Sequence, residues 1–317
     1  MSQPIKRLLV ESTDVASIAQ ETRSLTEACA VKAQDLKTSF IQFLTNGNTS
    51  KPIGTVSLDQ KLTPFAYRIE NSMDGPVFTK FAPNTDELYI FESGPMKSIL
   101  EEIDKFWGLK ENYNSLGFLH NRGILIEGPP GTGKSSLFQQ VTEMMIKRGD
   151  VIFFTTDVSA LREGLKNYRE VEPERKVVVV FEDIDEVVGS SERALLQLMD
   201  GDAQIQNVLY LGSTNYLSRL PQRLIRPGRF DKVIHLGPPQ LEARMTYLKK
   251  KLEGKEKEEQ IKCLAEQTGG FSFGHLRELI IGGYAMKEPI KEVLKRLRGS
   301  SVNESTSSHA GIRRLLG

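Results

Sequence analysis

A glycine-rich stretch near the middle of the chain constrains the fold most strongly. The segment follows the apolar run 123–126 and precedes residues with helical periodicity. A glycine-rich turn between a strand and a helix aims backbone N–H groups and a helix N-terminus at one point, where a polyphosphate can sit. This context predicts a nucleotide-binding loop rather than an ordinary connection. Its residues are Gly128, Pro129, Pro130, Gly131, Thr132, Gly133, Lys134, Ser135 and Ser136.

Two side chains of this loop have distinct expected roles. Lys134 would pair with the outer phosphates, and the Ser135 hydroxyl would complete the coordination shell of a Mg²⁺ ion. We therefore expect a nucleoside triphosphate and Mg²⁺ as cofactors.

Length and charge favour a soluble, cytoplasmic protein with two or three domains. The 317 residues exceed the size at which one core usually stops growing. The 42 basic and 41 acidic residues give a formal net charge of +1, hence no general attraction to nucleic acid or membranes. No apolar run is long enough to span a bilayer, and no signal peptide is evident. Cys29 and Cys263 follow no metal-ligand spacing, so we expect reduced core thiols.

Apolar periodicity divides the chain into four segments. Residues 1–92 read as helical to about residue 48 and then as a mixed or β-rich region, a candidate for target recognition. Strands and helices alternate over 93–237, which predicts an α/β fold with a doubly wound, mainly parallel sheet. Residues 238–299 carry helical stripes and predict a small helical lid. The tail, 300–317, is rich in Ser, Gly and Asn and is expected to be disordered.

Polar side chains follow two of the expected strands, 177–181 and 207–212. Glu182 and Asp183 come directly after the first, and Asn215 follows the second. Ligands of doubly wound sheets bind beyond the carboxyl ends of the strands, so these groups would face the phosphates. One acid must anchor the metal while another polarises the attacking water. The alternatives are solvated strand-end acids and a turn asparagine.

Further motifs complete a recognisable order. They are LLQLMDG over 195–201, RPGRFD over 226–231 and Gly-Pro-Pro over 237–239. Together with the glycine loop, the acids and Asn215, they resemble the AAA+ ATPases from about Gly94 to about Arg298. The resemblance implies that Asn215 is the sensor-1 residue and that Arg226 and Arg229 are arginine fingers acting on the neighbouring subunit.

The same resemblance implies ATP hydrolysis by a homo-oligomeric ring, most often a hexamer, that remodels or moves a macromolecule. A protein is the favoured target. The family usually ends its acidic strand with Asp then Glu, whereas this chain has Glu182 then Asp183. That order resembles the branch containing the mitochondrial translocase of folded Rieske protein, although no membrane anchor is seen here. By position, Glu182 is assigned to the metal and Asp183 to water activation.

Two other regions match the family less closely. Protein-threading members carry an aromatic residue, an apolar residue and a glycine in the loop after the strand that corresponds to 151–155. Here the corresponding segment, Leu161–Leu165, has no aromatic, and Tyr168 is as well explained as a core residue. In the lid, Gly274 is expected close to the adenine or ribose, and Arg277 either reaches the phosphates or is solvated.

Two alternative functions use the same phosphate loop. A DNA-acting ATPase, of the initiator, helicase-loader or clamp-loader type, is disfavoured by the near-neutral charge and by the absence of a recognisable basic reading module. A small-molecule kinase or nucleotide switch is disfavoured by the two arginines and the helical lid.

Overall fold

The computed structural model describes residues 42–45, 50–53, 61–73, 75–82, 95–201 and 204–299. The chain divides into two compact units, Met1–Asp59 and Gln60–Gly317. In the first unit, β1 (Gln42–Thr45) pairs antiparallel with β2 (Ser50–Ile53). The expected helix up to about residue 48 is therefore wrong over 42–45, where extended residues flank an Asn-Gly pair, a strong hairpin signal. Residues 1–41 and the expected disordered tail lie outside the described residues.

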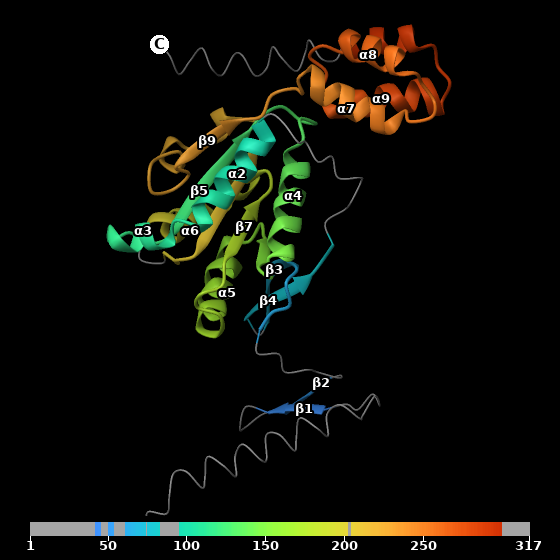
Figure 1. The fold of residues 1–317 in the computed structure, drawn as a ribbon. Coiled ribbons are helices and arrows are strands. Elements are labelled where there is room, and N and C mark those ends of the chain that lie inside the picture. The colour runs from blue at the N-terminus through green and yellow to red at the C-terminus, as the bar shows by residue number, and fades with distance from the viewer. Residues whose placement is uncertain are drawn as a thin grey trace, which may run out of the picture. The chain divides into compact units, whose positions relative to one another are not determined.

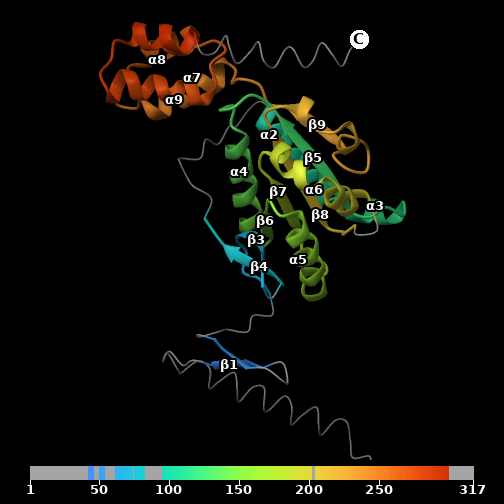
Figure 2. The same ribbon diagram turned by 180° about the vertical axis from the view of Figure 1, so that it is seen from behind.

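The second unit contains a seven-stranded sheet in the order β4-β3-β6-β7-β8-β5-β9 (Figures 1 and 2). Only β4 runs antiparallel to its neighbour; the other pairs are parallel. The strands are β3 (Ala66–Ser72), β4 (Gly75–Lys80), β5 (Asn121–Glu127), β6 (Val151–Phe154), β7 (Val177–Phe181), β8 (Val208–Thr214) and β9 (Lys232–His235). The predicted α/β fold with a mainly parallel sheet is confirmed.

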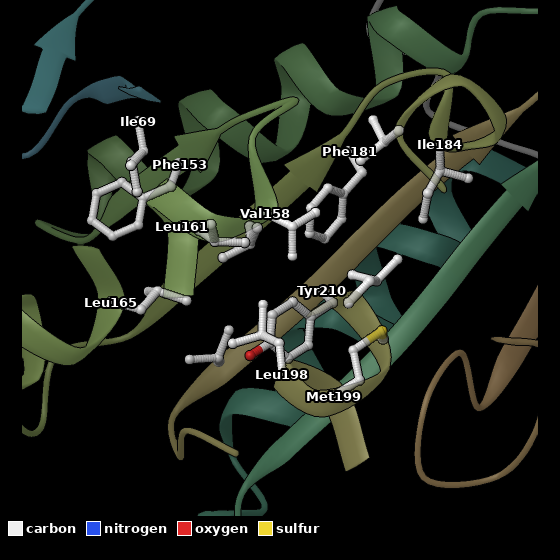
Figure 3. Packing of buried hydrophobic residues seen from close by; sticks show 14 of the residues in the cluster. Ile69, Phe153, Val158, Leu161, Leu165, Phe181, Ile184, Leu198, Met199 and Tyr210 are labelled. Carbon is white, nitrogen blue, oxygen red and sulfur yellow. The ribbon is translucent and has the colours of Figure 1, made fainter. Parts of the chain in front are cut away.

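Helices cover the sheet on both faces. They are α2 (Pro95–Trp107), α3 (Lys110–Ser115), α4 (Lys134–Lys147), α5 (Val158–Val171) and α6 (Ile184–Asp200). Every residue of β7 is buried, and its side chains alternate between two cores. Val179 and Phe181 pack with residues of α5 and α6 (Figure 3), whereas Val178 and Val180 pack with residues of α2 and α4. A strand covered on both sides explains the unbroken apolar run in the sequence.

The sheet begins before the predicted boundary at residue 92. β3 pairs in parallel with β6, with Ala66 opposite Ile152, and its inward side chains are buried. Residues 66–80 thus belong to the central sheet rather than to a separate N-terminal segment. The mixed or β-rich character of this region was predicted, but its place in the sheet was not, because β4 is a half-exposed edge strand that starts at Gly75 and Pro76, residues typical of loops.

The lid residues form a helical bundle with its own core. It contains α7 (Leu241–Lys251), α8 (Glu258–Gln267), α9 (Phe273–Ile280), a π-helical turn (Ile281–Ala285) and a helix over 290–299. Their buried side chains include Leu248, Phe271, Leu276 and Val293. Cys263 is exposed, which corrects the expectation of a core thiol. It lies on α8 away from the buried positions 261, 264 and 265.

The segment Leu161–Leu165, expected in a loop, lies inside α5. β6 ends at Phe154 and α5 begins at Val158, because the Asp157 carboxylate caps the helix by accepting hydrogen bonds from the backbone N–H groups of residues 159 and 160. Leu161 and Leu165 are fully buried. Tyr168 is a core residue, with its ring edge-on to Phe153 at 5.2 Å. Among the described residues, no helix combines the length and apolar character that a membrane span requires.

Candidate active site

The phosphate loop connects β5 to α4 in a shape that requires glycine at two positions. Gly133 precedes α4 with φ of +103°, a left-handed conformation that side chains disfavour. Gly128 packs against Leu236, the residue after β9, and an added Cβ at Gly128 would lie 2.1 Å from the Leu236 carbonyl oxygen. The Thr132 hydroxyl closes the loop by donating to the Pro129 carbonyl at 2.9 Å. The loop therefore leaves the N-terminus of α4 open toward a ligand.

Lys134 is the central cation of the site. Its side chain is almost completely buried, and its ammonium donates to the carbonyls of Gly128 at 2.6 Å and Pro129 at 3.0 Å. A third bond reaches the Asn215 side-chain oxygen at 2.6 Å. Burial lowers the Lys134 pKa, whereas the negative charges of Asp183 and nearby acids favour the ammonium. A cation in this position can meet phosphate oxygens.

The ends of β7 and β8 bring an acid and an amide together. Asp183 lies between β7 and α6 with φ of +46°, in the left-handed region. Its Oδ1 accepts a hydrogen bond from the Asn215 amide nitrogen at 3.3 Å. The oxygen of the same amide faces the Lys134 ammonium, so both ends of Asn215 have suitable partners. Three residues predicted from separate motifs thus form one hydrogen-bonded chain.

Glu182 and Ser135 provide oxygen atoms on the neighbouring side of the loop. Burial raises the Glu182 pKa and the charge of Asp183 adds to this effect, while a hydrogen bond with the Ser135 side chain and the charge of Arg68 lower it. A hydroxyl and a carboxylate are the hard oxygen ligands that Mg²⁺ prefers. No group of three or more His, Cys, Asp or Glu among the described residues could hold a metal. A Mg²⁺ held here would therefore depend on phosphate oxygens and water for its other ligands.

The loop and the lid together line a pocket of about 720 Å³. The backbone N–H of Phe273, at the start of α9, donates to the Gly131 carbonyl at 2.8 Å, so the lid touches the phosphate loop directly. The lining residues are Pro130, Gly131, Gly133, Lys134, Ser135, Ser136, Glu182, Asp183, Ser213, Asn215, Tyr247, Lys251, Phe273, Gly274 and Arg277. The volume lies in the usual range for small-ligand sites.

Not every predicted residue lines this pocket. Gly128, Pro129 and Thr132 belong to the loop but do not line the pocket. Gly274 and Arg277 of the lid do line the pocket. Four further lining residues, Ser213, Tyr247, Lys251 and Phe273, were not predicted. Tyr247 and Lys251 are four positions apart on α7, and this spacing was the available signal for a shared helix face.

Arg226 and Arg229 do not line the pocket of their own chain. Arg226 is exposed. Arg229 forms an ion pair with Asp200 at 3.4 Å and donates to the Arg223 carbonyl. The loop that carries both arginines is fixed to β5, because the Asp231 carboxylate accepts hydrogen bonds from the backbone N–H groups of Gly228 at 2.7 Å and Gly123 at 3.1 Å. Within the described residues, the pocket of one chain lacks both predicted arginine fingers.

Comparisons with known proteins find similar sequences over the region that carries these residues. The family model described as "ATPase family associated with various cellular activities (AAA)" matches residues 124–238. An ATP-dependent zinc metalloprotease FtsH 1 of Thermomicrobium roseum is 32% identical over 229 residues, which cover 64% of this chain and 34% of that protein. A cell division cycle protein 48 homolog of Archaeoglobus fulgidus is 29% identical over 238 residues, covering 64% of this chain and 32% of that protein. The chain thus spans about a third of the length of these relatives.

Proposed function

We propose that this chain binds ATP with Mg²⁺ and hydrolyses it as one subunit of a homo-oligomeric ring that remodels a protein target, because residues 124–238 match the AAA ATPase family model. The observation that carries the proposal is the hydrogen-bonded chain from Lys134 through Asn215 to Asp183. It places a cation, a neutral amide and a carboxylate in one pocket with the phosphate loop.

Each residue has a part in the proposed hydrolysis. Lys134 and the loop N–H groups bind the phosphates, and Ser135 and Glu182 hold Mg²⁺, which neutralises phosphate charge when bound. Asp183 accepts a proton from the attacking water. Asn215 orients that water through its amide once the phosphates, rather than Asn215, engage the Lys134 ammonium.

The arginines are proposed to act between subunits. Arg226 is exposed, and neither it nor Arg229 lines the pocket of its own chain, so a neighbouring copy is the natural recipient of their charge. Such a group stabilises the transition state of phosphoryl transfer. We propose a hexamer, the assembly that the resemblance to AAA+ ATPases implies.

A protein target is supported by the relatives and by the charge of the chain. Several relatives are named as ATP-dependent metalloproteases, a name that denotes action on proteins. The formal net charge of +1 offers no general attraction to DNA. Because α5 is continuous after Asp157, we propose that the target is not gripped by a loop between β6 and α5. Recognition is proposed for the part of residues 1–92 that precedes β3.

The proposal is tested by measuring ATP hydrolysis against protein concentration, with Mg²⁺ and with excess EDTA. Shared sites predict a specific activity that rises with concentration until the ring is assembled, and Mg²⁺ removal should abolish turnover. A constant specific activity in a strictly monomeric preparation would favour a small-molecule kinase or nucleotide switch. Retention on DNA with a steep salt dependence would favour the DNA-acting alternative.

A further inference from the structure

We propose that Ser213 and Thr214, the last two residues of β8, are positioning residues that hold the β7–α6 turn so that Asp183 faces the attacking water. This inference rests on the proposed ATP hydrolysis. Ser213 is 4% exposed and Thr214 is fully buried. The Ser213 hydroxyl bonds to Asp183 in the turn and the Thr214 hydroxyl bonds to Asp185 in the first turn of α6, so the two form a clamp across the ends of neighbouring strands.

The Ser213 hydroxyl binds the turn at Asp183 itself. Its oxygen accepts a hydrogen bond from the Asp183 backbone N–H at 3.2 Å. Asp183 has φ of +46°, a region that residues with a side chain rarely adopt, and such a conformation costs free energy and persists only where neighbouring contacts impose it. The hydroxyl of Ser213 is one such contact, because it gives the N–H of this strained residue a partner.

The Thr214 hydroxyl binds Asp185, which lies in the first turn of α6, two residues after Asp183. It donates to Oδ1 of Asp185 at 2.7 Å and accepts a hydrogen bond from the Tyr216 backbone N–H at 3.0 Å. The first bond fixes the start of α6, and the second fixes the backbone on the far side of Asn215. Asp183 and Asn215 are thereby held from both flanks, which keeps their side chains within 3.3 Å of each other.

Two more contacts support this clamp. The Thr214 carbonyl accepts a hydrogen bond from the Gly128 N–H at 3.2 Å, which connects the same residue to the phosphate loop. On the outer side, Arg219 lies 3.7 Å from Oδ2 of Asp185, and its guanidinium stacks over the Tyr216 ring at 3.9 Å. The clamp therefore aligns three parts of the site: the loop, the water-activating acid and the amide.

The two preceding strands of the sheet, β6 and β7, end in the apolar residues Phe154 and Phe181, whereas β8 ends in two residues that carry hydroxyl groups. The hydroxyls of Ser213 and Thr214 matter because of the directions in which they point. Adjacent residues of a strand point to opposite faces of the sheet, so a Ser-Thr pair can approach one turn from two sides. A single hydroxyl could not fix both position 183 and position 185.

The test compares Ser213→Ala, Thr214→Val and Thr214→Ser with wild type. Valine keeps the shape of threonine without its hydroxyl, and serine restores the hydroxyl. Ser218→Ala is the matched control, since Ser218 is exposed and lies just after the site. For each variant, kcat and KM for ATP are measured at equal ring assembly, together with the melting temperature and the affinity for a fluorescent ATP analogue.

We expect Ser213→Ala and Thr214→Val to lower kcat about 10- to 100-fold, because a small misplacement of a reacting group has effects of this size. KM and analogue affinity should stay close to wild type, and Thr214→Ser and Ser218→Ala should retain wild-type kcat. Unchanged kcat in Ser213→Ala and Thr214→Val, or a loss of analogue affinity that matches the loss of kcat, would overturn the clamp. A wild-type protein without ATPase activity would instead refute the proposed function.

Discussion

The Lys134 ammonium donates a 2.6 Å hydrogen bond to the side-chain oxygen of Asn215, which lies 81 residues farther along the chain. The same ammonium also bonds to two carbonyls of the phosphate loop. The chain's own oxygen atoms therefore surround the ammonium that binds phosphate in the proposed hydrolysis. Under that proposal, nucleotide binding would replace these bonds with bonds to phosphate oxygens and would leave the Asn215 amide to orient water.

Asp183→Asn should nearly abolish ATP hydrolysis and leave nucleotide binding intact. The amide cannot accept the proton of the attacking water, and general-base catalysis typically contributes about 10²–10⁴ in rate. Steady-state turnover and the affinity for a fluorescent ATP analogue measure the two effects separately. Glu186→Gln, an exposed acid in the first turn of α6, is the control and should keep wild-type turnover. Sustained hydrolysis by Asp183→Asn would exclude this assignment.

Arg226→Ala should poison mixed assemblies. If Arg226 acts on the neighbouring site, its loss removes about 10³–10⁵ in rate at that site. When the variant is mixed into wild type at constant total protein, activity should fall more steeply than the wild-type fraction. Arg148→Ala is the control, because this residue pairs with Asp104 at the far end of α4. A linear decline would show that each chain works alone.

Gly123→Ala should disturb the loop that carries the arginines. An added Cβ would lie 1.9 Å from the Arg229 carbonyl oxygen and 2.9 Å from the end of the Met199 side chain. Overpacking of this kind costs about 1–3 kcal/mol, which denaturant unfolding would detect. Gly189→Ala on α6 has open space around the new methyl group. It should be neutral or raise the free energy of unfolding by up to about 1 kcal/mol.

Tyr284 should make the lid lose stability at alkaline pH. Burial, together with the hydrogen bond to Glu256 and the charge of that carboxylate, raises its pKa from 10.0 to about 12. The folded chain then holds the phenol proton where the unfolded chain has lost it, so the free energy of unfolding falls between pH 10 and about 12. Tyr284→Phe should flatten this decline, and Glu256→Gln should reduce it in part. Unfolding curves at pH 9 and 11 give the comparison; an identical slope in Tyr284→Phe would contradict it.

Local patterns were sufficient for the centre of the fold. The expected bounds of β7 agree with the structure, and α4 follows the glycine loop as predicted, since a fully apolar strand and a helix after a glycine turn are strong signals within one short window. The grouping of Lys134, Asp183 and Asn215 was also predictable, because parallel strands meet at one sheet edge.

Features that depend on distant partners were not predictable. The place of β3 depends on pairing with β6, about 85 residues later, and no local pattern records that pairing. The continuous α5 was not predicted, because the family pattern places a loop at Leu161–Leu165, whereas the Asp157 cap starts the helix at Val158. Tyr247 and Lys251 line the pocket only because the lid is folded against the loop, and the bonds of Ser213 and Thr214 cross between strands.

The contact between Gly131 and the first turn of α9 has a mechanical consequence. The carbonyl oxygen of Gly131 belongs to the phosphate loop and is also the atom that the helical lid contacts. A phosphate bound at the loop would act on the same peptide group that the lid contacts. The backbone N–H groups of Phe273 at 2.8 Å and Gly274 at 3.4 Å both donate to this oxygen, so a shift of the phosphate loop would act on α9 directly.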